Sequence, residues 1–339
     1  MKKHANIPVF IPHLGCPNQC VFCNQRVISG VRTFDVNSVK QIIDTALETI
    51  DKDTSCEIAF FGGSFTGIDR SLMIELLKIA NSYVLSGRVS GIRCSTRPDY
   101  ISEDILADLK KYGVKVIELG LQSADNRVLE LTKRGHNFIA EKEACKLIKD
   151  NGFALVGQMM IGLPGSTEKS EEDTAEFIIS TGADAARIYP TVVFKDTELC
   201  NMVTEGDYTP LTNEEAVKRT ARVMRKFIEA GVDVIRVGLC SSENLVNDET
   251  YFSGPNHPAI GELVENEIFY ELIKEKIKTA AFDKCKTITV LVPKGAISKA
   301  IGQSKKNKLR LISEYSLTNI KFIENDLLTE YDVSIVKEG

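Results

Sequence analysis

Between residue 7 and about residue 240, short β-rich runs alternate with amphipathic helical runs, and this alternation limits the possible folds more than any other feature. The expected strands cover residues 7–11, 57–61, 91–95, 114–119, 154–160, 185–189 and 232–237. The expected helices have apolar positions three and four apart and cover residues 36–50, 71–85, 101–111, 140–151, 171–181 and 214–230. Repeated strand–helix units predict an α/β fold with a parallel sheet. Their number predicts a complete or partial TIM-like (β/α) barrel, with its chemistry at the C-terminal ends of the strands.

Length and composition indicate an ordinary globular protein with more than one domain. The chain has 339 residues, 43% of them hydrophobic and 26% charged. From this balance we expect no membrane span. Pro8 and Pro12 interrupt the apolar residues near the start, so we also expect no export signal and a cytoplasmic location. The formal net charge is −5, so any nucleic-acid-binding surface must be a local basic one.

The strand–helix alternation stops near residue 245, and this change predicts the domain boundaries. We expect a barrel over residues 1–245 and a linker loop with a long bridging helix over residues 246–283. A smaller α+β domain is expected over residues 284–339.

Three cysteines follow the first expected strand within eight residues, at Cys16, Cys20 and Cys23. Cysteine thiolates are the usual ligands of iron–sulfur clusters, and three ligands leave the fourth iron of a cube open to a substrate. The other cysteines lie in apolar or periodic segments, and we expect small buried side chains rather than a disulfide framework. These are Cys56, Cys94, Cys145, Cys200, Cys240 and Cys285.

Zinc is the competing reading of the cysteine triplet. His13 stands three residues before Cys16 and would complete a tetrahedral set of one histidine and three cysteines. Structural zinc sites usually draw ligand pairs from separated segments, whereas this triplet stands alone in the first strand-to-helix loop. The position therefore favours an iron–sulfur cluster.

The spacing of the three cysteines, with the aromatic Phe22 before the last, is similar to the motif of the radical S-adenosylmethionine (radical SAM) superfamily. Over roughly residues 5–240 the chain resembles the radical SAM domain of the Elongator catalytic subunit family and, more distantly, oxygen-independent coproporphyrinogen oxidase. The matching segments are FFGGSFT (60–66), STRPDY (95–100), ELGLQS (118–123), KRGH (133–136), QMMIGLPG (158–165) and RIYPT (187–191). The resemblance implies a 4Fe-4S cluster, S-adenosylmethionine and an electron donor such as flavodoxin or ferredoxin.

The same resemblance implies a set of cofactor-binding residues at the strand ends. Gly62 and Gly63 would let the backbone approach the methionine amino group, although Ser64 stands where an acidic residue often follows. Arg97 and Arg134 would anchor a carboxylate. The full set is Phe22, Gly62, Gly63, Ser64, Ser95, Arg97, Glu118, Gln122, Ser123, Arg134, Gln158, Gly162, Tyr189 and Lys195.

Several members of this set have an equally plain structural interpretation. Gln122 and Ser123 offer neutral groups suited to ribose hydroxyls, whereas Glu118 would need a partner if it points inward. A surface ion pair or a satisfied polar group at a strand end would explain any one of these residues as well.

The expected C-terminal domain reads strand 287–292, helix 296–301, turn 302–305, helix 307–315 and strand 319–323. It resembles a KH domain of the bacterial transcription-factor type, in which a Gly-x-x-Gly turn clamps single-stranded nucleic acid. Gly302 occupies the first position of the turn, and Lys305 replaces the second glycine. The expected RNA-binding residues are Lys299, Gly302, Gln303, Ser304, Lys305, Lys306, Lys308 and Arg310. A solvated helix pair is the alternative.

Elongator-type enzymes modify the wobble uridine of transfer RNA, but no segment here matches their acetyltransferase domain. The resemblance therefore implies the cofactor chemistry rather than the same product. An RNA base, in transfer or ribosomal RNA, is the expected substrate. A radical SAM enzyme of small molecules and a noncatalytic zinc-dependent RNA-binding protein remain as alternatives.

Overall fold

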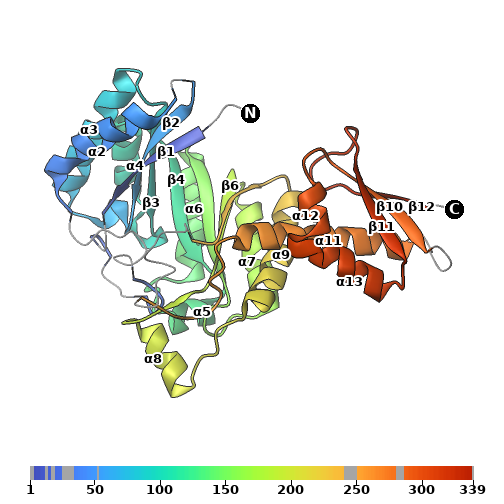
Figure 1. The fold of residues 1–339 in the computed structure, drawn as a ribbon. Helices are drawn as coiled ribbons and strands as arrows, with labels where there is room; N and C mark the ends of the chain where they lie inside the picture. Colours follow the sequence, from blue (N-terminus) through green and yellow to red (C-terminus); the bar gives the residue numbers. More distant parts are fainter. Residues whose placement is uncertain are drawn as a thin grey trace. The chain divides into compact units, whose positions relative to one another are not determined.

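A computed structural model describes residues 4–11, 14–16, 20–24, 34–51, 53–239, 250–279 and 286–337. The chain divides into two compact units (Figure 1). The first unit holds residues 1–211 and 226–256, and the second holds residues 212–225 and 257–339. His13, Cys240 and Cys285 lie outside the described residues.

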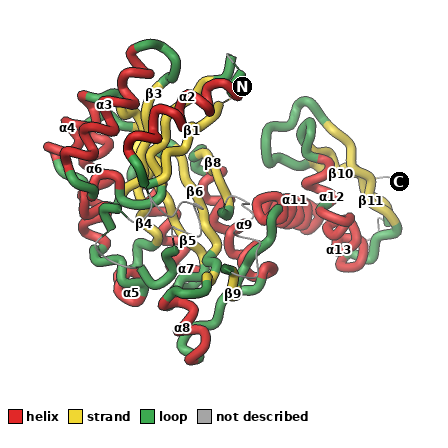
Figure 2. The backbone as a smooth tube through the Cα atoms, turned by 60° about the vertical axis from the view of Figure 1, so that its left-hand side comes forward, coloured by secondary structure: helices red, strands yellow, loops and turns green. Residues whose placement is uncertain are grey.

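The first unit is built on a seven-stranded sheet in the order β1-β2-β3-β4-β5-β6-β8. The strands are β1 (His4–Phe10), β2 (Ser55–Phe61), β3 (Gly91–Thr96), β4 (Val114–Gln122), β5 (Ala154–Ile161), β6 (Ala185–Pro190) and β8 (Asp233–Val237). Every neighbouring pair is parallel. The curled sheet confirms the predicted α/β class in its partial-barrel form (Figure 2).

Helices cover the sheet of the first unit, as the periodicity predicted. They are α2 (Val39–Thr49), α3 (Arg70–Leu85), α4 (Glu103–Lys111), α5 (Asn126–Leu131), α6 (Phe138–Asp150), α7 (Glu168–Ser180) and α8 (Glu198–Glu205), with the one-turn helices η1 (Val36–Ser38), η2 (Phe65–Gly67) and η3 (Pro98–Tyr100). Parallel strands that are buried on both faces need apolar side chains on both faces. In β2, for example, Ile58, Ala59 and Phe60 are all fully buried.

Side-chain caps fix where several helices begin. Asp69 accepts hydrogen bonds from the N–H groups of Ser71 and Leu72 at the start of α3. Thr167 forms a capping box with Ser170 at the start of α7. Such caps satisfy amide groups that have no partner inside the helix, and each typically contributes about 1 kcal/mol.

A two-stranded antiparallel ribbon of β7 (Val193–Phe194) and β9 (Tyr251–Ser253) was not predicted. Strands of two or three residues are too short to show an alternating pattern. The ribbon positions Lys195, whose N–H donates a hydrogen bond to the Thr250 carbonyl at 2.9 Å.

The second unit contains a three-stranded sheet in the order β11-β10-β12. Its elements are α11 (Ile260–Thr279), β10 (Thr287–Val292), α12 (Ile297–Ile301), η4 (Gln303–Lys305), α13 (Lys306–Glu314), β11 (Asn319–Glu324) and β12 (Ser334–Lys337). Strand β10 runs parallel to β11 and antiparallel to β12. The predicted β-α-α-β order is present, whereas β12 was not expected. Helix α9 (Asn213–Glu229) has residues in both units.

Helix α11 contributes to the core of the second unit. Its residues Phe269, Tyr270, Ile273 and Ile277 are buried in one cluster with residues of β10, α13 and β11. The sequence pattern predicted a bridging role for this helix, and its packing makes it part of the core of the C-terminal unit. Within the described segments, none of the helices has the length and apolar character to cross a membrane.

Candidate active site

The predicted cofactor-binding residues gather at the C-terminal edge of the sheet. Those that end or follow a strand are Gly62, Gly63 and Ser64 (β2), Ser95 and Arg97 (β3), Gln122 and Ser123 (β4), Gly162 (β5) and Tyr189 (β6). Glu118 and Gln158 lie within β4 and β5, and Lys195 follows β7. Since neighbouring strands run parallel, their C-terminal ends share one edge, which is where barrel enzymes place their chemistry.

The cysteine loop follows β1 at this same edge. Cys20 is buried, with 7% of its surface exposed, whereas Cys16 and Cys23 are partly exposed. The Cys16 sulfur lies 3.5 Å from the hydroxyl oxygen of Ser64. The loop therefore meets the segment after β2, where the sequence predicted a cofactor site.

Two buried arginines face the sulfur of Cys20. Arg134 Nη1 lies 3.1 Å from this sulfur, and Arg97 Nη1 lies 3.9 Å from it. Their exposed fractions are 5% and 4%. A guanidinium keeps its positive charge in proteins, so the pair places two cationic hydrogen-bond donors on a candidate ligand atom.

Both arginines are also anchored to other protein groups. Arg97 pairs with Asp99 through two hydrogen bonds of 2.9 and 3.0 Å and donates to the main-chain carbonyl of Arg134. Arg134 donates to the Gly120 carbonyl at 2.5 Å. Burial acts to raise the pKa of Asp99, but the contacts with His136 and Arg97 outweigh it and hold that pKa well below its usual range.

Main-chain hydrogen bonds hold the cysteine loop in place. The Val21 N–H donates to the Thr132 carbonyl at 3.2 Å, and the Leu199 N–H donates to the Val21 carbonyl at 2.8 Å. Val21 also belongs to a small apolar cluster with Val193 and Leu199, against which Phe22 packs. The predicted cofactor residue Phe22 thus braces the loop from the side of α8.

The cysteine loop and the turn after β2 approach each other so closely that only glycine fits. A Cβ atom on Gly15 would lie 2.4 Å from the Ser64 carbonyl oxygen, and one on Gly67 would lie 2.4 Å from the Gly15 carbonyl oxygen. Gly15 also has a φ of +75°, which disfavours other residues. Sequence reasoning missed both glycines, because a close approach between two loops leaves no periodic pattern.

Comparisons with known proteins decide the family. The model of the radical SAM superfamily matches residues 10–178, and that of the radical SAM C-terminal domain matches residues 183–269. The chain belongs to the radical SAM superfamily. It is thus a radical SAM enzyme, and the two predicted cofactors, a 4Fe-4S cluster and S-adenosylmethionine, agree with this membership.

Relatives of this radical SAM enzyme include proteins named for transfer RNA. The tRNA uridine(34) acetyltransferase of Methanocaldococcus jannaschii is 33% identical over 158 residues, which are 46% of this chain and 29% of that protein. Human Elongator complex protein 3 is 35% identical over 137 residues, 40% of this chain and 25% of its own length. An uncharacterised M. jannaschii protein is 31% identical over 228 residues, 64% of this chain and 70% of that protein. The chain thus spans less than a third of the M. jannaschii tRNA uridine(34) acetyltransferase and less than a third of human Elongator complex protein 3.

Solved structures agree on the fold of the radical SAM chain. The archaeal Elp3 of Methanocaldococcus infernus has a TM-score of 0.63 at 22% identity, covering 84% of this chain and 65% of that chain. Coproporphyrinogen III oxidase from Escherichia coli has a TM-score of 0.50 at 16% identity, covering 68% of this chain and 53% of that chain.

Glu118 belongs to a buried charge network within the radical SAM domain. Arg93 lies 2.9 Å from one carboxylate oxygen of Glu118, and Arg187 lies 2.8 Å from the other. Arg93 also pairs with Glu57 at 2.9 Å, so the network crosses β2, β3, β4 and β6. Glu118 was predicted to bind cofactor, but its carboxylate is already satisfied by protein groups. Arg93 was missed, although an arginine in the middle of an apolar strand was its available signal.

The end of β4 offers a polar group with no protein partner. Gln122 has a φ of +74° beside a register shift in β4. Its Oε1 atom is buried and has no hydrogen-bond partner within the described residues. The neighbouring Ser123 accepts a hydrogen bond from the Asp125 N–H at 3.2 Å. A buried amide oxygen left unpaired at a strand end fits a site for a polar ligand.

Gly162 has less freedom to bind a ligand through its main chain. Its N–H donates to Glu171 Oε1 at 2.6 Å, and its carbonyl accepts from the Tyr208 hydroxyl at 2.5 Å. Tyr189 is partly exposed, and burial raises the pKa of its hydroxyl. Gly162 is therefore fixed in its turn by hydrogen bonds on both sides of its main chain, whereas Tyr189 lies near the end of β6 and interacts with Arg187.

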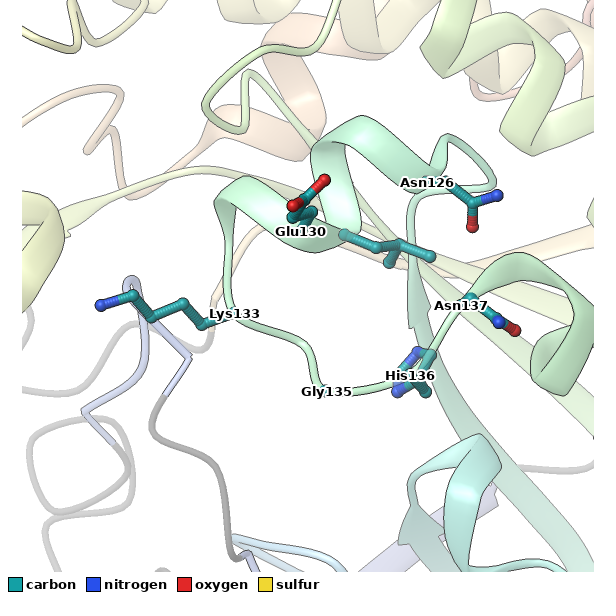
Figure 3. A pocket seen from close by; sticks show the side chains of 7 residues that line it. Asn126, Glu130, Lys133, Gly135, His136 and Asn137 are labelled. Carbon is teal, nitrogen blue, oxygen red and sulfur yellow. The ribbon is translucent and has the colours of Figure 1, made fainter.

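A cavity of about 440 Å³ lies at the junction between α5 and α6. In Figure 3, Lys133 points away from His136 and Asn137, which lie on the opposite side. The cavity is lined by Asn126, Leu129, Glu130, Lys133, Gly135, His136 and Asn137.

In the segments that the structure describes, no three His, Cys, Asp or Glu side chains are placed to hold a single metal ion. An iron–sulfur cube binds each cysteine at a different iron, so its ligands stand further apart than those of one ion. A buried sulfur facing two guanidinium groups suits such a cluster, whose thiolate ligands add negative charge.

Proposed function

We propose that Cys16, Cys20 and Cys23 ligate a 4Fe-4S cluster and that the polar groups at the strand ends bind S-adenosylmethionine. The observation that carries this proposal is the pairing of Cys20 with the guanidinium groups of Arg97 and Arg134. When bound, the cluster and S-adenosylmethionine supply one-electron chemistry that yields a 5′-deoxyadenosyl radical.

The residues of this chain position the reactants and exclude water. In this proposal Arg97 and Arg134 balance negative charge at Cys20 rather than anchoring a carboxylate of the cofactor. Gln122 directs an unpaired amide oxygen into a buried polar position, which suits a hydroxyl donor such as that of a ribose. Ser64, with 1% of its surface exposed, lies between the cysteine loop and the glycine pair that would contact the methionine part.

The proposed substrate is an RNA base, with a transfer RNA uridine as the first candidate. The relatives' names support transfer RNA, and the turn between α12 and α13 supports a contact with a nucleic acid strand. Gln303, Ser304, Lys305 and Lys306 are exposed on this turn. Gly302 cannot be replaced without strain, because its φ is +77° and a Cβ there would lie 2.9 Å from Asn307. A KH-like role of this unit remains part of the proposal.

Two of the basic residues predicted to bind RNA, Lys299 and Arg310, have acidic partners within the second unit. Lys299 lies 2.8 Å from Glu265, and Arg310 lies 2.7 Å from Glu267 while stacking 3.6 Å over the Tyr270 ring. These acidic partners come from α11, outside the stretch that had suggested an unopposed basic face. Lys305, Lys306 and Lys308 are therefore the better candidates for phosphate contacts.

The proposal also includes a cytoplasmic location and reduction by a flavodoxin or ferredoxin. Both follow from the radical SAM chemistry and from an RNA substrate, and neither depends on a particular contact in the structure.

An anaerobic assay tests the proposal. Reconstituted protein receives S-adenosylmethionine, dithionite and total transfer RNA, and 5′-deoxyadenosine and modified nucleosides are measured by mass spectrometry. We expect 5′-deoxyadenosine from wild type and from Cys145→Ala, a buried cysteine outside the site, but none from the Cys16→Ala, Cys20→Ala and Cys23→Ala triple variant. Well-folded, iron-loaded wild type that forms no 5′-deoxyadenosine would contradict the cluster proposal. Its formation without any RNA product would favour a small-molecule substrate.

A further inference from the structure

We propose that His136 is a positioning residue for the cluster, acting through Asp99 and Arg97 on the sulfur of Cys20. The inference rests on the proposed function, because it assumes that Cys20 is a cluster ligand. It adds a residue of the KRGH segment that the predicted cofactor site did not include.

A continuous line of contacts joins His136 to Cys20. His136 Nδ1 is buried, has no hydrogen-bond partner among the described residues, and lies 3.6 Å from Asp99 Oδ1, within ion-pair range but beyond a hydrogen bond. The two carboxylate oxygens of Asp99 accept hydrogen bonds from Arg97 Nε and Nη2 at 2.9 and 3.0 Å. The remaining nitrogen, Arg97 Nη1, lies 3.9 Å from the Cys20 sulfur. His136 and Arg97 Nε approach the same oxygen of Asp99, Oδ1, while Arg97 Nη2 holds the other, so a shift of His136 acts on the oxygen that orients Arg97.

The far side of the imidazole ring is fixed by a second buried carboxyl group. His136 Nε2 lies 3.1 Å from Glu141 Oε1, and the side chains of His136 and Glu141 are 1% and 0% exposed. Burial raises the pKa of Glu141 to about 7, while the contact with His136 opposes this rise. The ring is thus held between Asp99 and Glu141, from η3 and α6 respectively.

The geometry separates the two nitrogens of His136 by role. Nδ1 faces the carboxylate that orients Arg97, and Nε2 faces the anchor on α6. Hydrogen bonds to the sulfurs of an iron–sulfur cluster tune its reduction potential and its retention. Loss of the Nδ1 contact should therefore change the reduction potential and the retention of the cluster. Loss of the Nε2 contact should change them less.

Two isosteric substitutions test this separation. The amide nitrogen of asparagine falls near the Nδ1 position of histidine, and that of glutamine falls near Nε2. His136→Asn can therefore keep the Asp99 contact, whereas His136→Gln keeps the Glu141 contact only. His257→Gln is the matched control, because His257 also makes a contact through Nδ1, to the Ala259 N–H at 3.1 Å in the second unit.

The measurements are the cluster reduction potential, from redox titration followed by electron paramagnetic resonance, and the rate of iron release to a chelator. We expect His136→Gln to lower the potential and to speed iron release about 10-fold. His136→Asn and His257→Gln should stay near wild type. The double variant of His136→Gln with Arg97→Gln should shift no further than Arg97→Gln alone.

Each outcome bears on the inference. Equal shifts in His136→Asn and His136→Gln, or additive shifts in the double variant, would overturn the positioning role. So would a wild-type potential in a His136→Gln protein that binds iron normally. If His136→Gln fails to fold, the reduction potential and iron release of His136→Asn and of Arg97→Gln still test the contacts between His136, Asp99 and Arg97. Wild type that takes up no cluster would instead overturn the proposed function.

Discussion

Arg134 donates a hydrogen bond to the sulfur of Cys20 across 3.1 Å, although 114 residues separate the two in the chain. The contact joins the loop after β1 to the turn between α5 and α6. It places a permanent positive charge on a sulfur that lies in the interior. A cationic donor binds a negatively charged thiolate more strongly than a neutral thiol, so this contact suits a sulfur that ligates a cluster.

Arg134→Gln should weaken cluster binding about 10- to 100-fold, the usual cost of losing a group that supports a metal ligand. The exposed Arg70, which pairs with Asp108, provides the control Arg70→Gln. Iron and sulfide per chain, measured after a fixed dialysis, check the prediction. Equal iron retention in both variants would show that the Arg134 contact is incidental.

Gly15→Ala should destabilise the first unit by about 2 kcal/mol more than Gly87→Ala. Both glycines have left-handed φ values, +75° and +71°, so the backbone strain is matched. Only Gly15 has a backbone atom within 2.4 Å of the added Cβ, while Gly87 has nothing within 4 Å. Urea denaturation of the two variants gives the difference, and a difference near zero would refute the close-approach argument.

The charge network around Glu118 should behave as one unit. Glu118→Gln is expected to cost about 3 kcal/mol of unfolding free energy, because Arg93 and Arg187 would remain buried with weaker partners. Combining it with Arg187→Gln should cost less than the sum, with a coupling of about 1 to 3 kcal/mol. Asp150→Asn, on an exposed pair with Lys146, should change stability by less than about 1 kcal/mol. Additive losses would argue against a network.

Glu141 should make stability depend on pH. Because burial raises its folded pKa to about 7, above the value near 4.5 of a solvated carboxyl, its contribution is full below about pH 4.5 and is lost as the pH rises through 7. Glu141→Gln should therefore raise the free energy of unfolding, measured by urea denaturation, by an amount on the order of 1 to 3 kcal/mol at pH 8 and leave it nearly unchanged at pH 5. Glu143→Gln, on an exposed face of the same helix, controls for the loss of charge. A similar gain at both pH values would be inconsistent with a titrating Glu141.

The exposed turn of the second unit should contribute to RNA affinity through charge. Lys305→Ala with Lys306→Ala should weaken binding of total transfer RNA and reduce the slope of log affinity against log salt by about 2. Lys276→Ala with Lys278→Ala, which removes two exposed lysines of α11, keeps the net charge of the test variant. The same slope change in both double variants would mean that the turn has no particular role.

Much of the fold follows from the sequence, because apolar period and strand–helix alternation are local properties. All seven strands of the sheet appear within a few residues of their predicted ranges. The strand-end residues were predictable for the same reason, since parallel strands bring their ends to one edge. The C-terminal β-α-α-β order also followed from local pattern and a glycine turn.

Side-chain partners were less predictable, because they depend on register and on contacts far apart in the chain. The shift between Ile92 and Arg93 in the pairing of β3 with β4 helps decide which residues face Glu118, and no local pattern encodes it. Arg97 and Arg134 lie beside Cys20, but no local pattern predicted their partners Asp99, Gly120 and Cys20. The acidic residues of α11 changed the basic face of the second unit in the same way.

The cysteine loop is anchored through atoms that every amino acid shares. Val21 uses its own N–H and C=O to reach Thr132 and Leu199, so a change of apolar side chain at these positions leaves both bonds in place. Proline at position 21 or 199 is the exception, because it removes a donor. The apolar residues around the cysteines can therefore change while the position of the loop stays constant. The loop should tolerate mutation at these positions, whereas its three cysteines should not.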